Sequence, residues 1–203
     1  MSDRFAPYGA LAEALLHAVE DGGDGSHDVA HLHRVWLNAR AIAAEAGGDG
    51  EILAAAVLLH DGVHVEKSSP LRAQASRLAA ARAREVLAGL GWGAARVDAV
   101  AHAIAAHSFS AGIAPESLEA RVLQDADRLD AIGAIGVARC FYTAGRMGSA
   151  LYDTEDPRGE HRALDDQRFA LDHFRVKLLG LADGFQTGAG ARMAAERTRR
   201  IAR

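Results

Sequence analysis

The residues that most clearly indicate chemistry are His60 and Asp61, an adjacent pair at the end of the apolar run 54–59. A run of this composition predicts a helix that is buried on nearly every side. Two ionisable side chains at its end are costly to bury unless a partner compensates them. A divalent metal ion is such a partner, because imidazole and carboxylate are both good ligands for it.

Two further residues stand in similar surroundings. His31 lies one turn before Val35, at the edge of the apolar stripe of a predicted helix, so its ring can point partly inward. Asp127 lies in the mostly apolar stretch 122–137, where burial would raise the pKa of an isolated carboxyl and a bound cation would keep it ionised. Two imidazoles and two carboxylates from three helices therefore predict a metal site.

Each of these residues also has a structural explanation when it is taken alone. A histidine at the end of an apolar helix can be a hydrogen-bonded core residue, and Asp61 can simply begin a loop. Asp127 can pair with Arg128 or Arg121. The metal site is favoured by the combination and its order along the chain, not by any single residue.

Composition places these residues in an ordinary globular protein. The chain has 203 residues, 49% hydrophobic and 25% charged, which is typical of one soluble domain. The net charge of −4 shows no bias toward nucleic acid, and the single Cys140 excludes an internal disulfide. The N-terminus lacks the features of a signal peptide and no apolar stretch reaches about 18 residues, so we expect a cytoplasmic protein without a membrane span.

Helices must position the site, since alanine is abundant and only 5% of the residues are aromatic. We expect one all-α domain over 1–203, with a metal-binding core at about 26–145 and C-terminal helices at about 165–203. A break in the sixth predicted helix is expected near Gln124 and Asp125. The second predicted helix begins at a cap, Ser26 or Asp28, and ends at about 46, and the third is the apolar run that ends at His60. The other predicted helices cover about 5–20, 70–89, 94–108, 116–145, 165–182 and 188–202.

In this order the residues resemble the HD-domain metal-dependent phosphohydrolases, which are named for an adjacent His-Asp pair. The family pattern places a His on one helix, His-Asp on the next and an Asp on a later one, and the chain matches it in order and approximate spacing. The resemblance is closest to the branch typified by the bacterial YedJ and YpgQ proteins, and it covers nearly the whole chain. It implies an HD-domain helical bundle in which the metal ligands are His31, His60, Asp61 and Asp127.

The chain departs from many relatives in the loop after the His-Asp pair. Where those proteins carry a catalytic acidic pair, this chain has His64 and Val65, with Glu66 one position later. A mechanism that depends on such a pair is therefore not carried over. A Gly-Tyr-Pro signature is also absent from the sequence, which argues against a cyclic-dinucleotide phosphodiesterase.

The mixed ligand set indicates catalysis. Structural zinc sites are usually closed and rich in cysteine, whereas imidazole and carboxylate ligands with open positions are typical of a catalytic site. We expect one divalent ion, Mn²⁺ first, with Fe²⁺, Co²⁺, Ni²⁺, Zn²⁺ or Mg²⁺ as alternatives. The ion would lower the pKa of bound water and polarise a phosphoryl oxygen. Asp61, His64 and His107 are the predicted catalytic residues, although His64 could equally be an exposed loop residue.

Phosphoryl transfer also needs positive groups that neutralise developing charge. The predicted substrate-binding residues are Lys67, Arg72, His102 and Arg128. For Lys67 a solvated loop position is an open alternative, and for His102 a core or surface role. Asp130, one turn after Asp127, is predicted to hold a ligand histidine in its tautomer.

The resemblance implies nucleoside triphosphates as substrates, cleaved to monophosphate and pyrophosphate. Three alternatives remain open: a nucleotide 5′-phosphomonoesterase, a di-iron oxygenase with His102 and His107 as additional ligands, and a non-catalytic nucleotide-sensing protein. The expected partner is a small phosphorylated molecule, not nucleic acid or a membrane, and a homodimer is expected on general grounds.

Overall fold

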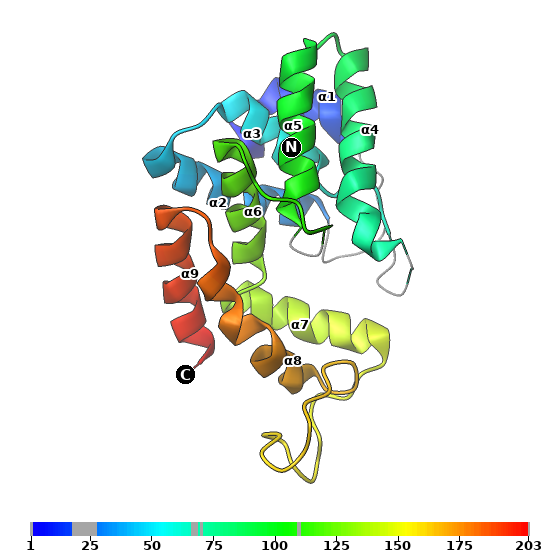
Figure 1. Cartoon of the computed structure of the whole chain (residues 1–203), viewed down its shortest axis with the longest axis vertical. Coiled ribbons are helices and arrows are strands. Elements are labelled where there is room, and N and C mark those ends of the chain that lie inside the picture. The colour runs from blue at the N-terminus through cyan, green and yellow to red at the C-terminus, as the bar shows by residue number, and fades with distance from the viewer. Residues whose placement is uncertain (1, 18–27, 66–68, 70, 109–110, 203) are drawn as a thin grey trace. The chain divides into compact units, whose positions relative to one another are not determined.

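The computed structural model of the chain describes residues 2–17, 28–65, 69, 71–108 and 111–202, and it is built almost entirely of helices (Figure 1). Within these ranges the extended structure amounts to an isolated parallel bridge between Ala150 and Phe169. The predicted all-α class is confirmed. The chain forms two compact units, an N-terminal unit (Met1–Asp127) and a C-terminal unit (Arg128–Arg203). One domain over 1–203 stays a prediction.

The N-terminal unit contains the elements that carry the predicted metal ligands. Its helix α3 is buried along 52–59, and α1, α2 and α5 pack against it. The elements in chain order are η1 (Ser2–Phe5), α1 (Gly9–Leu16), α2 (Val29–Ala46), α3 (Gly50–Leu59), η2 (Arg72–Gln74), α4 (Ala75–Gly89), α5 (Ala94–His107) and α6 (Leu118–Asp130), of which the last turn enters the C-terminal unit.

The first predicted helix, at 5–20, is shorter than expected. A 3-10 helix precedes it, and α1 begins only at Gly9. Pro7 accounts for the interruption, because it has no N–H to donate and restricts the residue before it. The end of the prediction, at 18–20, lies outside the described residues.

Aspartate caps begin both α2 and α3. Asp28 accepts a hydrogen bond from the His31 N–H at 2.9 Å, which confirms Asp28 as a cap. The alternative, Ser26, lies outside the described residues. Asp49 accepts from the N–H groups of Glu51 and Ile52, and the residues that follow it are buried as predicted.

Helices α4 and α5 form a hairpin whose two members run side by side (Figure 1). The helix predicted from residue 70 begins at Ala75, because a short 3-10 turn, η2, occupies Arg72–Gln74. Pro70 lies outside the described residues. The helix predicted at 94–108 is confirmed as α5, which ends one residue earlier, at His107.

The helical segment predicted over 116–145 is divided into two helices, but not at the predicted position. Helix α6 ends at Asp130 and α7 (Gly133–Met147) follows after two residues. The break does not lie near Gln124 and Asp125. It lies at Gly133, where a φ of +76° suits glycine and would strain other residues.

The C-terminal unit consists of α7, α8 (Ala170–Val176), η4 (Leu178–Gly184) and α9 (Gly188–Ile201). The helix predicted at 165–182 is wrong, since a short α-helix and a 3-10 helix replace it. The predicted surface excursion at 146–164 begins in the last residues of α7 and is otherwise irregular apart from the bridge at Ala150. A two-point ion pair between Arg162 and the buried Asp172 holds it. The last predicted helix is confirmed as α9. In the described part of the chain, no helix is both long and apolar enough to cross a membrane.

Candidate metal centre

The four predicted ligands meet around one point of the N-terminal unit. The Nε2 atoms of His31 and His60 are 3.3 Å apart, and Asp61 Oδ2 lies 3.4 Å from each of them. Asp127 Oδ1 lies 3.5 Å from His31 Nε2 and 3.8 Å from His60 Nε2. Two atoms that each lie about 2.1 Å from one ion are about 3.0–3.4 Å apart at octahedral or tetrahedral angles. The observed distances are close to that spacing.

Helix ends bring these side chains together. His31 lies in the first turn of α2, where the cap by Asp28 fixes the course of the chain. His60 directly follows the last residue of α3, and Asp61 comes next. Asp127 lies in the last turn of α6. Short-range capping and packing thus place groups from three separate segments at one location.

The orientation of His60 fits a ligand. Its Nδ1 lies 2.8 Å from the carbonyl oxygen of Val57, which can only accept, so Nδ1 carries the proton. In the neutral ring Nε2 then has the lone pair, and this atom faces His31 and the two carboxylates. A cation is the species that such a set of buried acceptors attracts, and a carbonyl-bound Nδ1–H is a common arrangement in metal-ligating histidines.

A backbone carbonyl therefore sets the tautomer of His60. In the C-terminal unit, Asp130 is buried and its carboxylate accepts a hydrogen bond from Arg139 Nη1 at 2.7 Å. A role of Asp130 toward His31 stays a prediction.

The site has a buried side and an exposed side. The side chains of His31 and His60 are fully buried, whereas those of Asp61 and Asp127 are each 29% exposed. Burial acts to raise the pKa of Asp127, but the charges that His60 and His31 carry when protonated outweigh it and hold the pKa below its usual range. Asp127 is thus an ionised carboxylate that solvent can reach.

Two buried amides that sequence analysis missed hold α6 in place. Asn38 Nδ2 donates to the carbonyl oxygen of Ala126 at 3.0 Å, and Gln124 Nε2 donates to that of Ala106 at 2.8 Å. These bonds join α6 to α2 and to α5 beside Asp127. The signal for Asn38 was present in the sequence, because it stands seven residues after His31 on the same face of a predicted helix.

His107 is a fifth member of the group. This last residue of α5 is buried, and its ring stands edge-on to that of His60 with centroids 5.0 Å apart. One potential ligand atom from each of His60, Asp61 and His107 lies within 4.8 Å of the others. Burial lowers the pKa of His107, and the charge of a protonated His60 lowers it further. Its Nδ1 is 2.6 Å from the Ile104 carbonyl oxygen, which leaves Nε2 as the atom able to face the group.

The structure does not bring the other predicted histidines into this group. His64 is exposed in the segment after Asp61, and its catalytic role stays a prediction. His102 Nε2 accepts a hydrogen bond from the Glu116 N–H at 3.1 Å, so this ring holds the connection between α5 and α6. His102 belongs to neither potential metal-binding group among the described residues.

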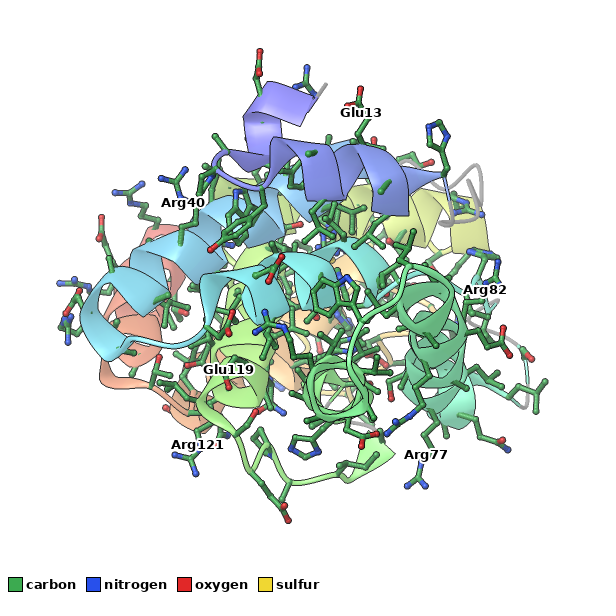
Figure 2. The ribbon with its side chains drawn as sticks, turned by 90° about the horizontal axis from the view of Figure 1, so that it is seen from above. Glu13, Arg40, Arg77, Arg82, Glu119 and Arg121 are labelled. Atoms are coloured by element: carbon green, nitrogen blue, oxygen red, sulfur yellow. The ribbon has the colours of Figure 1, made fainter. Side chains whose placement is uncertain are left out.

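The predicted cationic residues are placed as follows. In the C-terminal unit the guanidinium of Arg128 donates to the Gly184 carbonyl oxygen. Lys67 lies outside the described residues, and so does the side chain of Arg72. Their roles in phosphate binding stay predictions. Figure 2 shows the charged side chains of Glu13 and Arg82 on the outside of the helices, unlike the buried histidines of the candidate centre.

The fold and this cluster define an all-helical protein of the HD type. The family model of the HD domain matches residues 29–132, and the chain belongs to this family. The Bacillus subtilis protein YpgQ is 35% identical over 175 residues, which cover 84% of this chain and 77% of YpgQ. The family resemblance that we inferred from the sequence is confirmed.

Solved structures agree with this assignment. The crystal structure of B. subtilis YpgQ in complex with ADP is similar with a TM-score of 0.72 and 34% identity, over 94% of this chain and 92% of that one. An HD-superfamily hydrolase from Bacillus thuringiensis is similar with a TM-score of 0.68 and 31% identity, over 95% and 92%. The chain thus combines the fold of the HD-superfamily hydrolases with a His/Asp cluster that can hold a metal ion.

Proposed function

We propose that this protein is a metal-dependent phosphohydrolase that cleaves nucleoside triphosphates to monophosphate and pyrophosphate, with Mn²⁺ as the first choice of ion. The observation that carries the proposal is the convergence of His31, His60, Asp61 and Asp127 on one point, with a buried imidazole side and an exposed carboxylate side. The complex of B. subtilis YpgQ with ADP supports a nucleotide as the substrate.

The ligand set fits such an ion. His31 and His60 would hold it from the buried side, and Asp61 and Asp127 from the side that water and substrate can reach. Mixed nitrogen and oxygen ligation suits first-row divalent metals. When bound, the ion supplies Lewis acidity and lowers the pKa of water at neutral pH.

The neighbouring side chains complete the reaction. His107 is held by the Ile104 carbonyl with Nε2 available, and its lowered pKa keeps it neutral, so it can accept a proton from the attacking water. Asp61 orients that water in addition to its role as a ligand. His64, which is exposed three residues after Asp61, is proposed to exchange the proton with solvent.

A panel of nucleotides tests the proposal. Metal-stripped protein is supplied with Mn²⁺, and the release of pyrophosphate and of phosphate is measured for nucleoside tri-, di- and monophosphates. Pyrophosphate from triphosphates is the expected result. Phosphate from monophosphates would instead identify a 5′-phosphomonoesterase, and the absence of either product would contradict the proposal. The matched control is His60→Ala, which should abolish release.

One observation favours a second candidate, a di-iron oxygenase. His107 stands beside His60 and Asp61, where a second metal ion would need a ligand. The second residue considered for this role, His102, is instead hydrogen-bonded to the Glu116 N–H. Two bound irons per chain together with oxygen consumption would establish the oxygenase and exclude the phosphohydrolase as the main activity.

A further inference from the structure

Two arginines of the C-terminal unit bind the carbonyl groups that end α6. Arg197 of α9 donates a hydrogen bond to the carbonyl oxygen of Leu129. Arg139 of α7 donates one to the main-chain carbonyl oxygen of Asp130 at 3.3 Å. The last four carbonyl groups of an α-helix have no donors within the helix, so other groups must satisfy them. Here two guanidinium groups from two different helices take that part.

Each arginine is held by a second contact. Arg139 Nη1 lies 2.7 Å from Asp130 Oδ2, and the side chain of Asp130 is buried. Arg197 crosses Gly133, the first residue of α7, so closely that a Cβ atom added to this glycine would lie 3.4–3.5 Å from the Cβ, Cγ and Cδ atoms of Arg197. An ion pair and a packed apolar stem thus fix the two guanidinium groups where they meet α6.

The same turn is fastened a third time from its own side. Arg128 donates a hydrogen bond to the carbonyl oxygen of Gly184, the last residue of η4. Each of the three consecutive residues 128–130 is therefore bonded to a different element of the C-terminal unit, η4, α9 or α7. Helix ends commonly fray. This end cannot unwind without breaking all three attachments.

The turn that is fastened in this way carries a predicted metal ligand. With 3.6 residues per turn, Asp127 shares the last turn of α6 with residues 128–130. Its Oδ1 atom lies 3.5 Å from His31 Nε2 and 3.8 Å from His60 Nε2. A carboxylate oxygen must come within about 2.0–2.2 Å of an ion such as Zn²⁺. A frayed turn would therefore remove Asp127 from the ion.

We propose that Arg139 and Arg197 are positioning residues for the metal ligand Asp127. They act through the last turn of α6, so the C-terminal unit sets how tightly the centre holds its ion. This inference rests on the metal centre of the proposed function, but metal binding tests it without turnover.

A positioning role and a purely electrostatic role predict opposite changes. Removal of Arg139 takes one positive charge from the buried Asp130, which lies three residues after Asp127. Through charge alone, that loss would strengthen the attraction for a divalent cation. Through position, it releases the last turn of α6 and weakens metal binding. The direction of the change in Mn²⁺ affinity therefore distinguishes the two roles.

Arg162 provides a matched control. Like Arg139, it belongs to the C-terminal unit, has a side chain that is 20% exposed, and pairs with a buried aspartate, which is Asp172 at 2.6 Å. Arg139→Gln and Arg162→Gln thus remove the same kind of ion pair, but the first contacts α6 and the second holds the excursion at 146–164. Arg197→Met keeps an apolar stem over Gly133 and removes the donor to α6.

Mn²⁺ affinity is measured by calorimetry at a temperature well below the Tm of every variant, and Tm is measured alongside. We expect Arg139→Gln and Arg197→Met each to weaken Mn²⁺ binding about tenfold, as is usual for residues that support metal ligands. Arg139→Lys, which keeps a cationic donor, should restore most of the affinity. Arg162→Gln should lower Tm as much as Arg139→Gln does and bind Mn²⁺ like the wild type.

The outcomes separate this inference from the proposed function. Unchanged or tighter Mn²⁺ binding by Arg139→Gln and Arg197→Met would overturn the inference and leave the proposed function intact. An equal loss of affinity in Arg162→Gln would also overturn it, because the effect would then follow from general destabilisation. If both α6 variants bind Mn²⁺ more weakly but the wild type hydrolyses no nucleotide, the positioning role stands and the proposed function fails.

Discussion

His31 and His60 stand 29 residues apart in the chain, yet their Nε2 atoms face each other at 3.3 Å inside the protein. Unless a proton on His31 Nε2 is donated to His60 Nε2, two neutral imidazoles that both present a lone pair repel, and two protonated ones repel more strongly. A shared cation removes the repulsion, because both lone pairs can then point at the same positive charge. Of the four predicted ligands, these two histidines should therefore change their environment most when a metal ion binds.

Loss of a ligand should remove metal and activity together. His31→Ala and Asp61→Ala are each expected to lower Mn²⁺ affinity and pyrophosphate release by at least about 100-fold, since even second-shell changes cost about 10–100-fold. Metal content after gel filtration and initial rates measure the two effects. His33→Gln on the same helix as His31 serves as the control, and it should retain both properties. Full metal content in both alanine variants would refute the ligand set.

Metal binding should also stabilise the fold. The ion binds the assembled site and not the separated ligands of the unfolded chain, so Mn²⁺ at 100 times its Kd adds about 2.7 kcal/mol to the free energy of unfolding. We expect chelation to lower Tm and abolish hydrolysis, and added Mn²⁺ to restore both. An identical Tm with and without Mn²⁺ would show that the ligands do not bind the ion in the folded protein.

The buried amide of Asn38 should support the centre without touching it. Asn38→Ala removes the side-chain hydrogen bond to the Ala126 carbonyl oxygen, which also accepts within α6, and the loss is expected to cost about 0.5–1.5 kcal/mol of stability. Because α6 then loses a tether beside Asp127, Mn²⁺ affinity should fall about tenfold. Urea unfolding and calorimetry measure the two. Leu37→Ala, at a neighbouring position that is 47% exposed, should change neither by much.

The ion pair of the C-terminal unit predicts a pH dependence of stability. The hydrogen bond from Arg162 holds the pKa of the Asp172 carboxyl below its usual range. A depressed folded-state pKa stabilises the protein at pH values above the unfolded-state pKa, and this stability is lost as the pH falls through the folded-state pKa.

Asp172→Asn should therefore lower Tm at pH 7 but make progressively less difference as the solution becomes more acidic than the ordinary aspartate pKa. Thermal unfolding from pH 7 to pH 3 measures the change. Asp183→Asn, at an exposed position, is the control and should follow the wild type. An equal loss of Tm at every pH would mean that Asp172 acts through packing and not through its charge.

The sequence indicated the residues of the candidate metal centre because their signals are local. His60 and Asp61 end a run that only burial explains, and capping by Asp28 fixes the start of the helix that carries His31. It failed at Gly133, where the helical pattern continues unbroken but the backbone turns at a positive φ. The spacing of apolar residues indicates which face of a helix is buried. The same spacing can continue through a change of direction between two helices, so it does not reveal the break.

Contacts between distant segments were also beyond the sequence. The carbonyl that orients His60 belongs to Val57 in the same helical turn, a partner that the sequence pattern did not indicate. Gln124 of α6 donates a hydrogen bond to the carbonyl oxygen of Ala106 in α5. No spacing of residues in the sequence indicates that these two would meet. Residues such as Lys67, whose role depends on a loop, stay predictions.

The positions of the ligands at helix ends have an electrostatic consequence. Helix α3 ends just before His60, α5 ends at His107, and Asp127 lies in the last turn of α6. The C-terminus of a helix is the negative end of its macrodipole, which favours a nearby cation by about 0.3–1 kcal/mol. Three helix C-termini therefore add to the attraction that the carboxylates exert, opposed in part by the positive N-terminus of α2, which carries His31. A doubly charged ion gains more from this net field than a proton or a monovalent ion does. The electrostatic field of the centre should thus favour divalent over monovalent ions, whereas the geometry of the ligands discriminates among the divalent metals.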